Sequence, residues 1–85
     1  MGEVAVTFRI MPKDANVDLR GIEKDVRSLA EVRSVELEPV AFGLKALRVL
    51  IVVPDAAGGT EKVERRLREI KGVGNIQAVD VRRLL

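Results

Sequence analysis

The order in which the hydrophobic period changes along this sequence restricts the fold more than any other feature. Residues 3–10 alternate between apolar and polar side chains, and this period of two with β-branched residues predicts a strand. Between residues 18 and 30 the apolar residues recur every three or four positions, which predicts a helix with Asp18 as its N-cap. The segment 33–42, "RSVELEPVAF", returns to a period of two and predicts a second strand.

The second half of the chain repeats this sequence of periods. Residues 44–53, "LKALRVLIVV", are nearly all apolar, which is typical of a central strand. The loop 55–60 then precedes a helix that Gly59 or Thr60 is expected to cap. The apolar stripe of this second helix is predicted at Val63, Leu67 and Ile70. Residues 74–85 form the last predicted strand.

The resulting order of elements, β-α-β-β-α-β, is that of the split βαβ arrangement of ferredoxin-like α+β folds. It predicts a four-stranded antiparallel sheet with two helices on one face, in a single domain spanning residues 1–85. The expected strand order is 4-1-3-2, with the second and fourth strands at the edges. Pro39 fits an edge strand because it has no N–H to donate to a neighbour.

The last strand has an irregular alternation. Ile76 and Ala78 would share one face, and Val79 and Val81 would share the other, so a regular strand cannot bury both Ile76 and Val81. We therefore expect a bulge near residues 77–79, which would let both of these side chains reach the core.

The sheet face opposite the helices should be open, and two groups of residues are predicted to bear on its role. Leu50 and Val52 would point away from the helices, leaving part of this face apolar and suggesting a contact surface. The acidic residues Glu31, Glu36 and Glu38 could bind a cation, although charged side chains at strand edges are usually solvated.

The sequence contains no histidine and no cysteine. The commonest general base, the commonest nucleophile and the usual zinc ligands are therefore missing, so we predict no enzyme activity, no catalytic residues, no metal and no cofactor. No apolar run approaches the roughly 20 residues that span a membrane, and the first residues lack the pattern of a signal peptide. A cytoplasmic protein without a membrane partner is the expectation.

The stretch "VAFGLKAL", residues 40–47, places one of only two aromatic residues at the predicted hairpin turn. Gly43 suits a short hairpin loop because it adopts left-handed backbone conformations readily. Phe42 has two interpretations from physics alone. Its ring could fold back over the end of the core, or it could project as an anchor for a partner protein. Lys45 and Arg48 would line the open side of the hairpin, where they could contact such a partner, and we count Lys45 among the predicted partner-binding residues.

Three segments of the chain are distinctive: "EPVAFGLKAL" at 38–47, "GGT" at 58–60 and "DVRRL" at 80–84. Together they resemble the archaeal elongation factor 1-beta family and the C-terminal exchange domain of the eukaryotic factor, and the resemblance covers essentially the whole chain. It implies a ferredoxin-like guanine nucleotide exchange factor that releases GDP from elongation factor 1-alpha, the GTPase that carries aminoacyl-tRNA to the ribosome. It also implies that the tip, residues Ala41, Phe42 and Gly43, contacts this partner.

The C-terminal tail departs from the eukaryotic pattern, in which a lysine beside the C-terminus points toward the Mg²⁺ site of the GTPase. The last lysine here is Lys71, and the penultimate residue is Leu84. Arg82 and Arg83 are the nearest cations and the candidates for this role. They should point to opposite faces of the strand, with Arg82 beside Asp80. Alternatively, both are solvated edge-strand residues or pair with acids of the partner.

Two other functions are compatible with a ferredoxin-like fold: an RNA-binding module and a small-molecule regulatory domain that dimerises through its sheet. RNA-binding sheets of this kind stack bases on aromatic residues of the central strands. The predicted central strands contain only Phe8, which should point toward the helices. We therefore expect no direct contact with nucleic acid, and nucleotide exchange, which needs no bond chemistry, agrees best with the composition.

Overall fold

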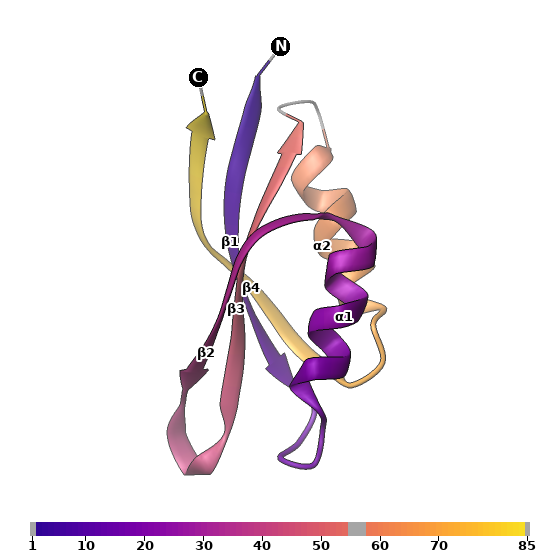
Figure 1. Ribbon diagram of the computed structural model, residues 1–85, viewed down its shortest axis with the longest axis vertical. Coiled ribbons are helices and arrows are strands. Elements are labelled where there is room, and N and C mark those ends of the chain that lie inside the picture. Colours follow the sequence, from indigo (N-terminus) through magenta and orange to yellow (C-terminus); the bar gives the residue numbers. More distant parts are fainter. Residues whose placement is uncertain (1, 55–57, 85) are drawn as a thin grey trace.

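The computed structural model describes residues 2–54 and 58–84, and its elements follow the predicted order (Figure 1). The helices are α1 (Leu19–Leu29) and α2 (Gly59–Arg68). The strands are β1 (Glu3–Pro12), β2 (Glu31–Pro39), β3 (Lys45–Pro54) and β4 (Val73–Leu84). A single 3₁₀ turn, Ala41–Gly43, connects β2 to β3.

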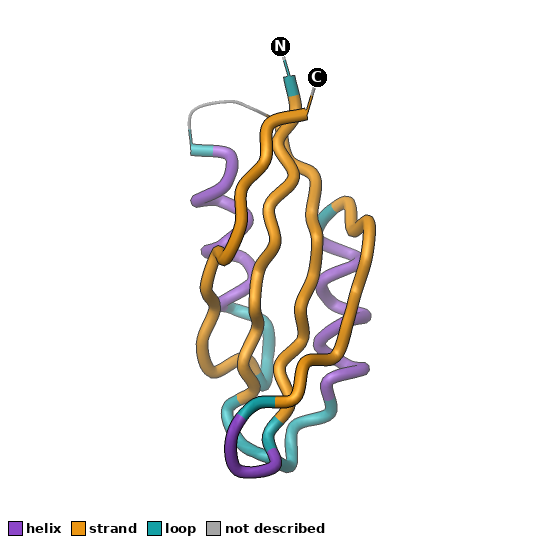
Figure 2. The backbone as a smooth tube through the Cα atoms, turned by 90° about the vertical axis from the view of Figure 1, so that its left-hand side faces the viewer, coloured by secondary structure: helices purple, strands orange, loops and turns teal. Residues whose placement is uncertain are grey.

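The four strands form one antiparallel sheet in the order β2-β3-β1-β4, as predicted. Figure 1 shows both helices on the same side of this sheet, and Figure 2 shows the opposite face with no helix in front of it. The predicted ferredoxin-like fold is therefore confirmed. β2, which ends in Pro39, is an edge strand whose only strand neighbour is β3.

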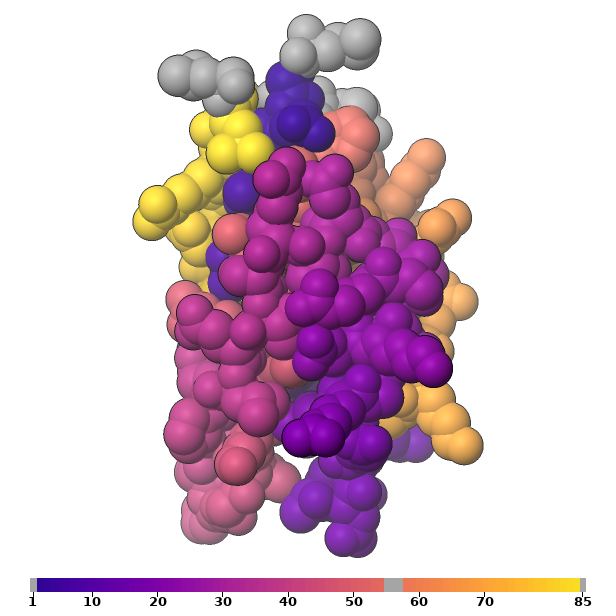
Figure 3. All heavy atoms as spheres, in the orientation of Figure 1, coloured from indigo at the N-terminus to yellow at the C-terminus, as the bar shows by residue number. Residues whose placement is uncertain are grey.

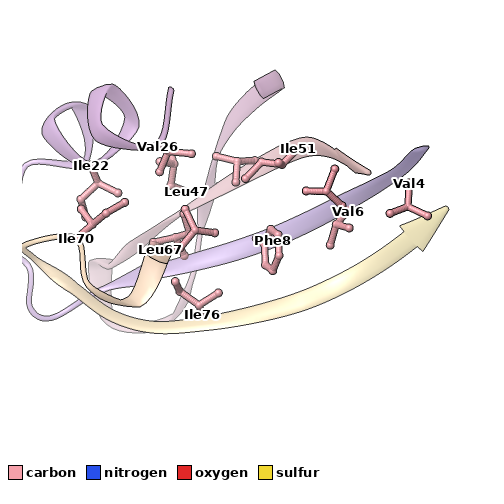
Figure 4. Packing of buried hydrophobic residues seen from close by; sticks show 13 residues of the cluster. Val4, Val6, Phe8, Ile22, Val26, Leu47, Ile51, Leu67, Ile70 and Ile76 are labelled. Carbon is pink, nitrogen blue, oxygen red and sulfur yellow. The ribbon is translucent and has the colours of Figure 1, made fainter. Parts of the chain in front are cut away.

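The core lies between the sheet and the two helices (Figure 4). Every second residue of the central strands points into it, because successive strand side chains alternate between faces. From β1 and β3 these are Val4, Val6, Phe8, Ile10, Leu47, Val49, Ile51 and Val53. The helices cover them with Ile22, Val26 and Leu67, and Ile70 adds to the cover just after α2. Phe8 is fully buried, so its ring is unavailable to any ligand on the open face.

The two helices begin differently. α1 begins as predicted, since the Asp18 carboxylate accepts a hydrogen bond of 3.0 Å from the Arg20 N–H. α2 is capped by Gly58 rather than by Gly59 or Thr60, so the predicted cap was wrong by one or two residues. Gly58 has φ of 78°, a left-handed conformation that glycine adopts without strain. Residues 55–57 of the predicted loop lie outside the described residues.

β4 contains the predicted bulge. Asp80 pairs with Thr7 and Ala78 with Phe8, which leaves Val79 as the extra residue. Ile76 is buried as expected, but Val81 is 56% exposed, so the prediction that it reaches the core was wrong. The bulge does place Val81 opposite Val6 on the helix side. Figure 1 shows the reason for its exposure: this end of β4 lies on the far side of β1 from both helices.

Candidate functional site

The β2–β3 hairpin ends in a tight turn with two left-handed residues. The Val40 N–H donates to the Leu44 carbonyl at 2.8 Å, and the Leu44 N–H donates to the Ala41 carbonyl at 3.3 Å. Gly43 has φ of 75°, as predicted for this loop. Phe42 has φ of 62° and ψ of 32°, which costs a residue with a side chain roughly 1–2 kcal/mol. The turn therefore keeps a strained backbone at its aromatic residue.

The Phe42 side chain does not pack against the core of the protein. Its exposed fraction is 98%, so the interpretation that the ring caps the core is wrong. Ala41 and Gly43 beside it are also exposed. A fully hydrated aromatic ring on a strained backbone stabilises nothing in the isolated chain. Strain of this kind is found at binding sites, where the surrounding structure holds a residue in position for a ligand.

A groove of about 390 Å³ separates the hairpin from the start of α1. Figure 3 shows this hollow between the pink hairpin end and the purple segment that enters the helix. Its apolar wall includes Leu37, which is 57% exposed, and Val17. Lys45 also lines the groove, on the same face of β3 as Leu47. The prediction that Lys45 lies on the open side of the hairpin was therefore wrong, because it and Arg48 have opposite strand parity.

The open face carries an ion-pair network near the same hairpin. Glu38 Oε1 accepts a hydrogen bond of 3.0 Å from Arg48 Nη1, and Glu38 Oε2 lies 2.8 Å from Arg9 Nε. The Arg9 Nε atom is buried and its N–H is not aligned with this oxygen, so the second contact is an ion pair without a good hydrogen bond. The hydrogen bond from Arg48 is the main cause of a lowered pKa at Glu38. Partial desolvation opposes this shift, and Arg9 adds to it.

Acidification is expected to destabilise the protein through Glu38. A pKa below the ordinary value of 4.5 means that the folded state stabilises the carboxylate. This contribution is complete above that value and is lost as the pH falls through the lower pKa of the folded state. Urea unfolding between about pH 6 and about pH 3 should show a smaller loss of stability for Glu38→Gln than for the wild type.

The matched control for this titration is Glu31→Gln. Glu31 lies on the same strand and pairs with Arg33 at 2.9 Å, but its side chain is 55% exposed against 27% for Glu38. Exposed pairs contribute little, so Glu31→Gln should keep the wild-type pH dependence. Equal curves for all three proteins would mean that the two arginines do not stabilise the Glu38 carboxylate.

Two expectations about the open face differ from what the structure shows. Glu38 is paired with arginines, and among the described residues no group of three or more acidic side chains is placed to hold a metal ion. Leu50 and Val52 do point away from the helices, opposite Thr7 and Ala5. However, Val52 is buried by its neighbours and Leu50 is half-buried, so this face exposes less apolar surface than predicted.

Arg9 was missed in the sequence, although a signal was present. It lies between Phe8 and Ile10 on a predicted central strand, and both neighbours point into the core. The alternation therefore puts Arg9 on the open face, where a charge at the middle of a sheet requires a counterion. Its counterion, Glu38, comes from a strand two positions away in the sheet, which the local pattern could not indicate.

The tail residues lie at the other end of the sheet. Arg82 and Arg83 pair with Ala5 and Val4, so they point to opposite faces as predicted. The predicted Asp80–Arg82 ion pair is present at 2.9 Å. The hairpin closes at Lys45 and β3 ends at Pro54, a run of ten residues that spans about 30 Å. The structure therefore groups Ala41, Phe42, Gly43 and Lys45 at one end and separates them from both arginines.

Among the described residues, none of the helices has the length and apolar character needed to cross a bilayer. The two aromatic residues of the whole sequence are Phe8, which is buried, and Phe42, which lies beyond the strands. The open face therefore presents no aromatic ring on which a nucleic-acid base could stack.

The sequence matches the EF-1 guanine nucleotide exchange domain over residues 5–84. It is 45% identical to elongation factor 1-beta of Methanothermobacter thermautotrophicus and 37% identical to that of Methanobrevibacter smithii, in each case over the full length of both chains. It is 35% identical to elongation factor 1-beta of Staphylothermus marinus, covering 99% of each chain.

The fold is also similar to solved structures of distant sequence. The ACT domain from GTP pyrophosphokinase of Chlorobium tepidum superimposes with a TM-score of 0.58 at 17% identity, covering 96% of this chain and 99% of that domain. This likeness concerns the fold alone. Together, the domain match and the full-length relatives confirm the resemblance stated above: the chain belongs to the archaeal elongation factor 1-beta family and carries an EF-1 guanine nucleotide exchange domain.

Proposed function

We propose that this protein promotes the release of GDP from elongation factor 1-alpha by binding that GTPase through the tip of the β2–β3 hairpin. The family to which the chain belongs consists of nucleotide exchange factors of translation elongation, which agrees with this role. Exchange forms and breaks no covalent bond, so it makes no demand for the histidine and cysteine side chains that the sequence lacks. A cytoplasmic location accords with a role in translation.

The observation that carries the proposal is the state of Phe42. Moving its ring from water into an apolar pocket would contribute roughly 1.5–3 kcal/mol to binding. The ring is already projected by the left-handed turn, so little ordering remains to be done when the partner arrives. The free-energy cost of the left-handed backbone at Phe42 arises when the chain folds, whereas burial of the ring stabilises the complex when the partner binds.

Binding becomes exchange only if the protein prefers one state of its partner. GTPases hold GDP through a phosphate-binding backbone, a P-loop lysine and Mg²⁺. An exchange factor must therefore bind the nucleotide-free form more tightly than the GDP-bound form. Linkage is reciprocal, so the factor weakens GDP binding by the same ratio as GDP weakens binding of the factor.

The anchor and the tail would have separate tasks in this scheme. Phe42 is about 30 Å from the tail along the strands, so it would hold the partner without touching the same region as Arg82 and Arg83. A guanidinium keeps its charge at any accessible pH. Near the phosphates and the metal ligands of the GTPase, it would compete with Mg²⁺ and favour the emptied site.

The direct test is release of fluorescent GDP from an archaeal elongation factor 1-alpha, followed by stopped flow with excess unlabelled GDP. The expected result is faster release that depends on the concentration of this protein. Release at the spontaneous rate over the whole concentration range would overturn the proposal. Retardation of tRNA in a gel without any effect on GDP would favour an RNA-binding role instead.

Neutralising the tail should slow exchange without preventing binding. Deleting residues 82–85 would also remove the pairing of this segment with Glu3, Val4 and Ala5, so substitutions are cleaner. We expect the double variant Arg82→Gln, Arg83→Gln to bind the GTPase nearly as well as the wild type. GDP release at millimolar Mg²⁺ should fall by about tenfold, equivalent to ~1.4 kcal/mol, and recover as Mg²⁺ is lowered.

The control for the tail variant is Arg33→Gln, which removes another exposed arginine that is paired with a carboxylate on the same chain. It should release GDP at the wild-type rate at every Mg²⁺ concentration. If the tail variant behaves in the same way, the tail is only the end of an edge strand and the metal is loosened by another part of the surface.

A further inference from the structure

We infer that Arg9 and Arg48 form a second binding site that takes a carboxylate side chain from the surface of the same GTPase. The inference rests on the proposed function, because it names a further contact with that partner. The site lies on the open face of the sheet, whereas Phe42 lies at the turn and Lys45 faces the groove. A helix does not cover it (Figure 2).

Two arginines converge here on one carboxylate. Arg9 and Arg48 are direct cross-strand partners, a placement in which like charges repel each other. Glu38 bridges them, giving one oxygen to each guanidinium. These three side chains together carry a net charge of +1, and Glu36, the direct cross-strand partner of Arg48, lies beside them on the same face. Each guanidinium has five N–H donors, and the contacts to Glu38 use a small part of them.

The contact between Arg9 and Glu38 is incomplete. Arg9 Nε is a buried nitrogen without an aligned acceptor, and such groups are rare in folded proteins. Because Nε itself is buried, a second carboxylate would bind the terminal nitrogens of Arg9, and it could do so without breaking a well-formed hydrogen bond. The side chains of Arg9 and Arg48 remain 32% and 40% exposed, so they can be reached from solvent.

The network is also held in place before any partner binds. Glu38 already pairs with both arginines in the free chain. Two guanidiniums that already converge lose less side-chain entropy on binding than two free arginines would. Planar guanidiniums also match the geometry of a carboxylate, to which they can donate two parallel hydrogen bonds.

The position of the network suits a partner that is anchored at Phe42. The hairpin closes at the pair of Pro39 and Lys45, and Glu38 is the next residue along β2. Arg48 is three residues beyond Lys45, about 10 Å along the strand. A protein surface that buries the Phe42 ring and continues over the open face would reach both arginines.

The charge around the network favours a single carboxylate over a polyanion. At the paired strand positions of the open face there are three basic residues, Arg9, Arg48 and Arg82, and five acidic ones, Glu3, Glu31, Glu36, Glu38 and Asp80. The phosphates of an RNA would meet these carboxylates and be repelled. A single acidic side chain meets fewer of these carboxylates than a polyanion does, and it can accept from the unused N–H donors of the two arginines.

The test measures binding to nucleotide-free archaeal elongation factor 1-alpha for Arg48→Gln, Glu38→Gln and the control Arg33→Gln. Arg48→Gln lowers the network charge from +1 to 0. Its Kd should rise by about tenfold, in the range of a hydrogen bond to a charged group. Glu38→Gln raises the charge from +1 to +2, so its association should become faster and more sensitive to salt. Arg33→Gln should bind like the wild type, because its ion pair lies elsewhere on the hairpin.

A merely structural role for the network predicts a different pattern. Both variants lose the Glu38–Arg48 pair, so a lower melting temperature is expected in either case, but with a structural role alone Arg48→Gln and Glu38→Gln would change binding in the same direction. That result would overturn the inference, as would a Kd for Arg48→Gln equal to that of Arg33→Gln while the wild type binds. Failure of the wild type to bind would overturn the proposed function as well. Retardation of tRNA that Arg48→Gln abolishes would assign the site to phosphates instead.

Discussion

Replacing Phe42 by alanine is expected to weaken binding to elongation factor 1-alpha by about 2 kcal/mol or more, the scale of an interface hot spot. The free energy of unfolding should change by less than about 0.5 kcal/mol, because the ring is 98% exposed and stabilises nothing in the free chain. Calorimetric titration of the nucleotide-free GTPase and urea unfolding of the two proteins measure these quantities separately.

Phe42→Gly provides the matched control for the backbone. It removes the same ring as Phe42→Ala, but glycine adopts φ of 62° without the strain that alanine retains. Both variants should lose binding, whereas the glycine variant should be the more stable of the two by up to about 1 kcal/mol. A large fall in the stability of Phe42→Ala would show that the ring packs against the protein after all.

Replacing Phe8 by alanine should have the opposite outcome. Phe8 is fully buried among residues of both helices and the two central strands, and such a truncation costs about 3–5 kcal/mol of unfolding free energy. This is a large part of the roughly 5–15 kcal/mol that stabilises a typical domain. Urea unfolding should show a lower midpoint with a similar slope.

The two phenylalanines form a controlled pair, because the chemical change is identical and only its position differs. The folded fraction of Phe8→Ala should bind the GTPase with nearly the wild-type Kd, since its ring is remote from the proposed contacts. A loss of affinity beyond the unfolded fraction would mean that the core controls the shape of the hairpin. A stable Phe8→Ala protein would contradict the packing shown in Figure 4.

Local sequence patterns predicted the burial of a side chain correctly wherever its environment followed from its neighbours in the sequence. The alternation in β1 predicted its buried face, because a half-buried element must repeat its apolar residues with its own period. The helical spacing in α1 correctly predicted the burial of Ile22 and Val26, whereas Leu29 at the end of the same stripe is 39% exposed. The bulge near Val79 was also predictable, since the alternation itself is interrupted there. The cap of α2 was misplaced because two adjacent glycines offer the same freedom, and only the backbone selects between them.

The candidate site was likewise predictable only in part from the sequence. The tip motif in the sequence indicated a partner contact at Phe42 through resemblance, but physics left two interpretations open. The exposed ring and its left-handed backbone decided between them, because both depend on how the whole hairpin is held. Lys45 and Arg48 are three residues apart on one strand, so the alternation alone puts them on opposite faces, and the prediction that both lie on the open side overlooked this.

Sequence pattern and composition were enough to predict the order of the elements, the buried faces of β1 and β3, and the absence of histidine and cysteine chemistry. These properties follow from residues that are close together in the chain or from composition alone. The network of Arg9, Glu38 and Arg48 and the position of the tail at the opposite end of the sheet from Phe42 became visible only in the folded chain. Both depend on the register of strands brought together from distant parts of the chain, and cross-strand register is set by packing of the complete sheet rather than by any local pattern.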